Sequence, residues 1–180
     1  MRFLFTLSIK NNWCARHVDY VLVFSQADCD SDAHLAPPPG FKVINDDGIE
    51  YCMKLKKNLY GACQASANWF VMLRDSLTER GHTQSKVDPC LFFKKDSVIV
   101  TCVDDCIIFA KDHSTVKEII KSLESNFKLI DEGDLSAYLG INIAKVGENT
   151  WALSQHFLID RMLKALGLED DSKVHDTPST

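Results

Sequence analysis

The sequence contains no long apolar segment, and it is poor in basic residues. None of its hydrophobic runs approaches the roughly 20 apolar residues needed to cross a bilayer. The amino-terminal run at residues 3–9 is at the lower size limit for a signal peptide, and no small-residue cleavage site follows it. Lys and Arg number 20 against 25 Asp and Glu, a net charge of −5. We expect a soluble protein without a membrane partner, and the charge argues against a free-standing nucleic-acid binder that relies on a basic surface.

Paired cysteine motifs are absent as well. Seven cysteines make an odd count, and no Cys-x-x-Cys pair occurs among them. Cys102 and Cys106 flank two aspartates, but no His-rich segment or second cysteine pair completes a tetrahedral zinc set. This usage of cysteine favours a reduced, intracellular protein.

The composition is otherwise that of a folded domain. With 180 residues, 46% of them hydrophobic and 25% charged, the chain is long and apolar enough to bury a core. We find no internal repeat and no low-complexity tract. The six histidines are scattered, mostly beside expected turns or element ends, and we expect most of them to be solvated: His17, His34, His82, His113, His156 and His175.

Two adjacent aspartates, Asp104 and Asp105, separate two apolar, β-branched runs at residues 97–101 and 107–110. Both runs predict strands, and the Asp-Asp pair predicts the tight connection of a β-hairpin. In a plain strand, neighbouring side chains point to opposite faces, but at a turn they can serve one site. Carboxylates collected at a hairpin tip offer the hard oxygen ligands that Mg²⁺ prefers.

Asp19 is the candidate for a third carboxylate. It lies within the strand-like run at residues 17–24, and a buried strand does not tolerate a charge without a partner or a metal. The alternative is that Asp19 lies on a solvent-exposed face of the strand.

The pattern of the chain predicts an α+β fold, with helices packed on one face of a largely antiparallel sheet. In the helix at 115–127, Thr115 and Glu118 fit a capping box. In the helix at 65–80, Trp69, Phe70, Leu73 and Leu77 share one face, and Gly81 is a natural stop. The tail from Glu169 is polar, and we expect it to be frayed. Helices are expected at 2–12, 65–80, 115–127 and 157–166, and strands at 17–24, 51–55, 91–93, 97–101, 107–110, 138–143 and 151–153, with a loop at 26–47.

Taken together, these segments resemble the reverse transcriptase of Ty1/copia-type retrotransposons, in the right order over residues 3–178. The most diagnostic stretch is LKKNLYGACQA at 55–65, which resembles the family's LKKSLYGLKQA. Val103-Asp104-Asp105 matches its Tyr-Val-Asp-Asp motif. The other matching segments are the approach to the first catalytic motif at 12–19, PPPGF at 37–41, DEGDL at 131–135, YLGINI at 138–143, LSQ at 153–155 and DTP at 176–178.

The resemblance implies an RNA-directed DNA polymerase that uses two Mg²⁺ or Mn²⁺ ions. It implies that Asp19, Asp104 and Asp105 are the catalytic, metal-binding carboxylates. It further implies that Phe24 is the aromatic gate against a ribose 2′-hydroxyl, and that Gln64 contacts the incoming nucleotide or the template. Leu139 and Gly140 would lie near the primer terminus.

The implied partners are an RNA or DNA template with a primer, deoxynucleoside triphosphates, and other Pol segments such as the fingers and RNase H. By analogy with the family, the protein would work in a cytoplasmic virus-like particle. We expect a reverse-transcriptase palm at residues 1–150 with the fingers largely missing, and the start of a thumb or carboxy-terminal extension at 151–180.

Some positions depart from the family pattern. Cys102 replaces the tyrosine before Val-Asp-Asp, and Cys63, Ser66 and Ala67 stand where the family has lysine, proline and arginine. The loss of two cations should weaken the grip on nucleic acid. Two alternatives therefore stay open: a catalytically silent, truncated remnant that acts at most as an interaction module, and a different two-metal enzyme such as a nucleotidyl cyclase.

Overall fold

The computed structural model describes residues 2–147 and 150–168. The chain divides into two compact units, Met1–Asp134 and Leu135–Thr180. The predicted division into a palm at 1–150 and a following segment at 151–180 concerns functional regions, whereas the two compact units are defined by contacts. The predicted division therefore stays a prediction. Within the described residues, no helix is long and apolar enough to span a membrane.

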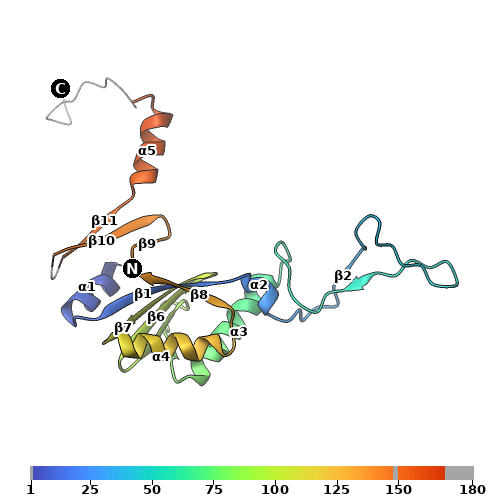
Figure 1. Cartoon of the computed structure of the whole chain (residues 1–180), viewed down its shortest axis with the longest axis horizontal. Helices are drawn as coiled ribbons and strands as arrows, with labels where there is room; N and C mark the ends of the chain where they lie inside the picture. Colours follow the sequence, from blue (N-terminus) through green and yellow to red (C-terminus); the bar gives the residue numbers. More distant parts are fainter. Residues whose placement is uncertain (1, 148–149, 169–180) are drawn as a thin grey trace. The chain divides into compact units, whose positions relative to one another are not determined.

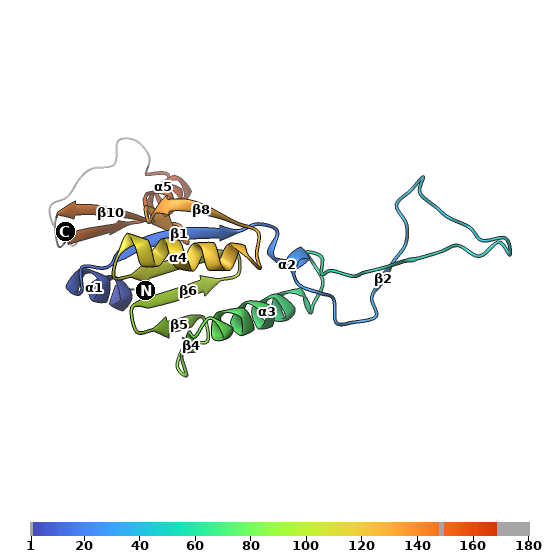
Figure 2. The ribbon, with the colours of Figure 1, turned by 60° about the horizontal axis from the view of Figure 1, so that its bottom comes forward.

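The first unit is built on a six-stranded sheet in the order β4-β5-β6-β7-β1-β8 (Figures 1 and 2). Every neighbouring pair in it is antiparallel. The mainly antiparallel α+β architecture expected from the sequence is therefore confirmed. The strands are β1 (Cys14–Tyr20), β4 (Thr83–Gln84), β5 (Leu91–Lys94), β6 (Ser97–Cys102), β7 (Asp105–Ala110) and β8 (Leu129–Asp134).

The helices α3 (Ala65–Glu79) and α4 (His113–Glu124) lie along the same side of this sheet (Figure 1). Trp69 and Leu73 of α3 and Ile120 of α4 belong to one buried cluster with Ile108 of β7. On α3, three of the four residues expected on the apolar face are buried, and Phe70 is half-buried. The periodic apolar pattern of each helix therefore forms the main core of the unit.

The other face of the sheet carries a helix as well. Phe109 points away from its neighbour Ile108, because successive side chains of a strand alternate between faces. There it meets Phe5 of α1 (Arg2–Lys10), with ring centroids 5.7 Å apart and planes at 82°. This explains why β7 is buried from Cys106 to Ala110 without alternation. The prediction that helices pack on one face is thus wrong for α1.

Both ends of one predicted strand and the start of one predicted helix are also corrected. The strand expected at 17–24 runs instead from Cys14 to Tyr20, and Phe24 lies on the short helix α2 (Val23–Gln26). The expected capping box does not form, since Asp112 caps α4 by accepting a hydrogen bond from the Thr115 N–H at 2.7 Å.

The chain between α2 and α3 is largely irregular, as expected for 26–47. Figure 2 traces this excursion. Its regular part is a two-stranded sheet of β2 (His34–Leu35) and β3 (Met53–Lys54). Several apolar side chains in it are exposed, namely Leu35, Phe41, Val43, Ile44, Ile49, Tyr51 and Met53.

The second unit contains a three-stranded sheet in the order β11-β10-β9 and the helix α5 (His156–Ala165). Its strands are β9 (Ala137–Tyr138), β10 (Ile141–Gly147) and β11 (Thr150–Ser154). The single strand expected at 138–143 is instead a hairpin, which turns at Leu139 and Gly140. The polar tail from Glu169 lies outside the described residues.

Candidate active site

The paired carboxylates lie where β1 and β7 run side by side. Asp19 and Asp105 are direct cross-strand partners, so both side chains leave the sheet on the same face. This is the face opposite the α3/α4 core, because the adjacent pair Val18 and Cys106 belongs to that core. Asp19 is half-buried on this face, and its role as a metal ligand rather than a solvent-facing residue stays a prediction.

Asp104 lies next to Asp105 in the turn of the hairpin, and its backbone is bonded to the end of β1. The turn between β6 and β7 consists of Val103 and Asp104, and Asp105 is the first residue of the following strand. The predicted hairpin is therefore confirmed, with its turn shifted by one residue from the Asp-Asp pair. The Asp104 carbonyl accepts a hydrogen bond from the Tyr20 N–H at 2.8 Å. This bond ties the turn to the end of β1, next to Asp19.

The neighbouring acids act electrostatically on Asp19. The pKa of Asp19 is raised, first by burial, then by the negative charges of Asp104 and Asp105, and then by Glu132. His17 opposes this effect and lowers it. A carboxylate whose charge is disfavoured by three neighbouring acids is a natural site for a bound cation.

His17 is a member of this site that the sequence analysis did not identify. Its Nε2 lies 3.0 Å from Oδ1 of Asp105, and the residue is half-buried inside β1. The expectation that most histidines are solvated is wrong for His17. The available signal was its position two residues before Asp19, which places both side chains on one face of a strand.

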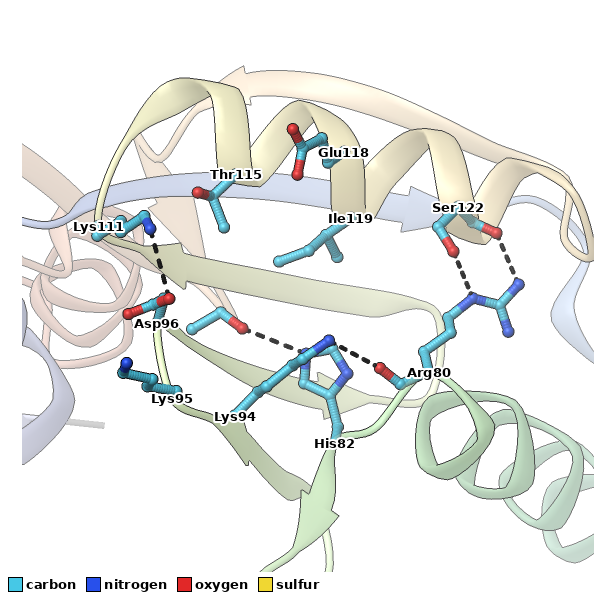
Figure 3. Close-up of a pocket in the computed structure, with 11 residues that line it drawn as sticks. Arg80, His82, Lys94, Lys95, Asp96, Lys111, Thr115, Glu118, Ile119 and Ser122 are labelled. Atoms are coloured by element: carbon cyan, nitrogen blue, oxygen red, sulfur yellow. Dashed lines mark hydrogen bonds and ion pairs between the residues drawn. The ribbon is translucent and has the colours of Figure 1, made fainter.

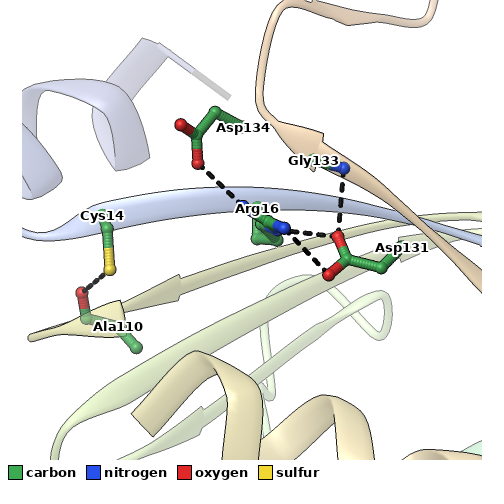
Figure 4. A network of polar contacts seen from close by, with 6 residues as sticks. All are labelled: Cys14, Arg16, Ala110, Asp131, Gly133 and Asp134. Carbon is green, nitrogen blue, oxygen red and sulfur yellow. Dashed lines mark hydrogen bonds and ion pairs between the residues drawn. The ribbon is translucent and has the colours of Figure 1, made fainter. Parts of the chain in front are cut away.

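An ion-pair cluster on the face of β1 opposite Asp19 fixes the neighbouring strand β8 (Figure 4). Arg16 of β1 binds both carboxylate oxygens of Asp131, through Nε at 2.7 Å and Nη2 at 3.0 Å. It also binds Asp134 at 3.1 Å. The register between β1 and β8 shifts between His17 and Val18, so the strand is irregular at this point. The Arg16 contacts hold this irregularity, and Glu132 within it adds its charge to the field at Asp19.

The turn itself is conformationally unusual. Val103 has a φ of 57°, a value that β-branched residues rarely adopt. Its carbonyl accepts a hydrogen bond of 2.8 Å from Nε1 of Trp69 on α3. The core helix therefore supports the strained turn that carries Asp104.

The chemistry of these side chains fits a divalent cation, since carboxylate oxygens are hard ligands. Asp19, Asp104 and Asp105 would hold it. Within residues 2–147 and 150–168, however, no three His, Cys, Asp or Glu side chains are already arranged as a metal-binding group. One oxygen of Asp105 is instead directed at His17. The site is thus a set of suitable donors rather than a formed cage.

The expected nucleotide-binding residues lie on other elements of the first unit. Phe24 on α2 is half-buried and packs on Tyr60, with ring centroids 4.7 Å apart. Gln64 precedes α3, and its amide donates a hydrogen bond to Ser31 Oγ at 2.8 Å. Their contacts with a nucleotide stay predictions.

The expected primer contacts, Leu139 and Gly140, belong to the second unit. They form the turn between β9 and β10, and both have positive φ values, 48° and 76°. Two positive φ values are typical of a tight hairpin turn. The proximity of Leu139 and Gly140 to the three aspartates and to a primer stays a prediction.

Comparison with known proteins gives a consistent result. The family model described as "Reverse transcriptase (RNA-dependent DNA polymerase)" matches residues 1–179. The Pol polyprotein from transposon RE1 of Arabidopsis thaliana is 28% identical over 168 residues, which cover 91% of this chain and 11% of that protein. The Pol polyprotein from transposon TNT 1-94 of Nicotiana tabacum is 25% identical over 97% of the chain and 13% of its own length.

A truncated transposon Ty1-A Gag-Pol polyprotein of Saccharomyces cerevisiae is 31% identical over 132 residues, or 72% of the chain and 11% of its own length. The chain therefore spans roughly a tenth of the length of these curated relatives.

Proposed function

Because the chain belongs to the reverse transcriptase (RNA-dependent DNA polymerase) family, with Ty1/copia-type Pol polyproteins as relatives, we propose that it is the polymerase palm of such a polyprotein. In this role it adds deoxynucleotides to the 3′-hydroxyl of a primer on an RNA or DNA template. The observation that carries the proposal is the cross-strand pair of Asp19 and Asp105, with Asp104 in the adjoining turn.

The three carboxylates would act as metal ligands. Two Mg²⁺ or Mn²⁺ ions, when bound, polarise the attacking hydroxyl and neutralise charge on the triphosphate. Asp19 contributes a carboxylate whose charged form is disfavoured by burial and by the neighbouring acids. His17 holds one oxygen of Asp105 and so limits the rotation of that carboxylate. The Trp69 hydrogen bond keeps the Val103–Asp104 turn in place while the substrate aligns.

Other residues would position the substrates. Phe24 would exclude the 2′-hydroxyl of a ribonucleotide, and its packing on Tyr60 favours one fixed ring position. Gln64 would contact the incoming nucleotide or the template. Leu139 and Gly140 would lie near the primer end. The remaining partners would be other Pol segments, including fingers and RNase H, in a cytoplasmic virus-like particle.

Primer extension tests this proposal. Purified chain is incubated with an RNA template, a DNA primer, deoxynucleotides and Mg²⁺ or Mn²⁺, beside an Asp104→Asn variant. We expect extension by the wild-type chain. In the variant the extension rate should fall by about a hundredfold or more, because a carboxylate ligand of the metal ions that stabilise the transition state is removed.

The matched control is Asp46→Asn, which makes the same substitution at an exposed loop residue. It should extend primers as the wild type does. Absence of extension by a folded wild-type chain, or equal extension by Asp104→Asn, would contradict the proposal. In the first case the chain would be the silent remnant considered above.

A further inference from the structure

A pocket lies at the opposite end of the hairpin from the aspartates. Its volume is about 310 Å³, and it lies between α4, the residues that follow α3, and the connection between β5 and β6 (Figure 3). Ser97, in its wall, begins β6, whereas Cys102, the partner of Asp105, ends that strand. Five residue steps of about 3.3 Å place the two sites roughly 17 Å apart. The pocket is therefore separate from the candidate active site.

The pocket is cationic in an acidic protein. Its lining contains four cationic side chains, from Arg80, Lys94, Lys95 and Lys111, against two carboxylates, from Asp96 and Glu118. Lys111 and Asp96 face each other across 3.4 Å, so this pair is internally neutral.

The other cations are not neutralised by acids. The Arg80 guanidinium donates only to neutral oxygens, those of Ser76, Ser122, Ser125 and Asn126. Lys94 Nζ donates to the Arg80 carbonyl at 3.0 Å. In the part of the chain that the structure describes, neither Arg80 nor Lys94 forms a salt bridge. Positive charge in this pocket thus exceeds what the protein itself compensates.

A buried histidine adds an unused hydrogen-bonding atom. His82 is only 4% exposed, and its Nε2 lies 3.3 Å from Ser97 Oγ. Its Nδ1 is buried without a hydrogen-bond partner. Figure 3 shows the ring beside the Lys94 side chain. Burial, followed by the charges of Lys94 and Arg80, lowers the pKa of His82, which keeps the ring neutral.

We propose that this pocket binds a small phosphate-bearing anion, of the size of phosphate or pyrophosphate, held by the ammonium groups of Lys94 and Lys95. Lysine acts on phosphate as a point charge, and the many acceptor oxygens of the anion suit donors that converge from different directions. The volume is at the lower end of the range for ligand pockets, which favours a small ligand. Such an anion neutralises the excess charge. The inference does not depend on the proposed polymerase function.

Calorimetric titration of the whole chain with pyrophosphate, in a phosphate-free buffer containing EDTA, tests the site. EDTA removes divalent cations, so metal-bridged binding at Asp19, Asp104 and Asp105 does not contribute. We expect saturable binding that weakens by about tenfold in Lys94→Gln, because a charge-assisted hydrogen bond is lost. Binding should strengthen in Glu118→Gln, which removes a repelling charge from the wall.

The matched control is Lys121→Gln, a substitution of an exposed lysine on the same helix as Glu118 that lies outside the pocket lining. It should bind pyrophosphate as the wild type does. Equal weakening of pyrophosphate binding in Lys121→Gln and Lys94→Gln would overturn the proposal, since the net charge of the protein would then explain the binding without the pocket. Absence of binding by the wild type up to about 10 mM pyrophosphate would overturn it as well.

A competition arm identifies the source of the phosphate. A short single-stranded oligodeoxynucleotide is added to the pyrophosphate complex, with Lys94→Gln in parallel. If the oligonucleotide displaces pyrophosphate from the wild type but not from Lys94→Gln, the result supports the site and assigns it to a nucleic-acid backbone phosphate. Retention of pyrophosphate supports the site and assigns it to a free anion.

Discussion

At the scale of single residues, the surroundings decide what each titratable side chain does. His17 and His82 are the same residue type, yet one faces a carboxylate and the other is buried beside cations. Asp19 is surrounded by like charges, so its folded-state pKa lies above the unfolded value. A raised carboxyl pKa means that the folded state binds more protons than the unfolded state. Stability is therefore lost as pH rises through the interval between the two pKa values.

The substitution Asp19→Asn should stabilise the chain near neutral pH when no divalent cation is present. The gain should be about 0.5 kcal/mol, because an exposed or half-buried charge interaction has this magnitude. The variant should also lack the loss of stability that the wild type shows as pH rises above about 3.8. Urea unfolding in EDTA at several pH values measures both effects, and Asp46→Asn serves as the neutral control. A destabilised Asp19→Asn variant would show that the repulsion inferred at this site is absent.

At the scale of elements, the ends of helices and strands were harder to predict than their interiors. Helix α3 has the bounds expected from its apolar spacing within a residue, and Gly81, with φ of 81°, follows it. The start of α4 was misassigned, because Asp112 competes with Thr115 for the cap position and tertiary context selects Asp112. Local sequence permits several caps, whereas only one fits the chain direction that leaves β7.

The cap of α4 leads to a prediction. Asp112 accepts hydrogen bonds from the Thr115 N–H and the Ser114 hydroxyl, and these lower its pKa to about 2. Asp112→Ala should lower the midpoint of urea unfolding at neutral pH. Asp112→Asn keeps a cap acceptor, so its midpoint should stay close to that of the wild type. The contribution of the wild-type carboxylate is present above pH 3.8 and is lost as pH falls toward 2. Equal midpoints for the alanine and asparagine variants would mean that the cap does not stabilise α4.

At the scale of the whole molecule, the charge balance limits the grip on nucleic acid. The net charge is −5. Cys63 and Ala67, which stand where the family has cations, are both exposed beside or on α3. A phosphate contact made by a restored cation would release counterions and raise the salt dependence of binding.

The double variant Cys63→Lys/Ala67→Arg should therefore bind primer–template more tightly than the wild type. Each new phosphate contact should steepen the plot of log affinity against log salt by about 0.9 for duplex substrates. Fluorescence anisotropy at a series of salt concentrations measures this slope. Thr83→Lys/Val87→Lys adds the same charge at exposed positions elsewhere. If both variants bind alike, the α3 segment does not face the nucleic acid.

The sequence alone determined the family, the antiparallel α+β class, the hairpin and the main core helices. These features depend on local periodicity and on motifs that are contiguous in the chain, such as residues 55–65 and Val103-Asp104-Asp105. Only the tertiary structure decided the cross-strand register that pairs Asp19 with Asp105, the contact of His17, the helix on the second face and the cationic pocket around His82. The physical reason is separation along the chain. Residues 86 positions apart, as Asp19 and Asp105 are, meet only because β1 and β7 pair, and no local pattern encodes that pairing.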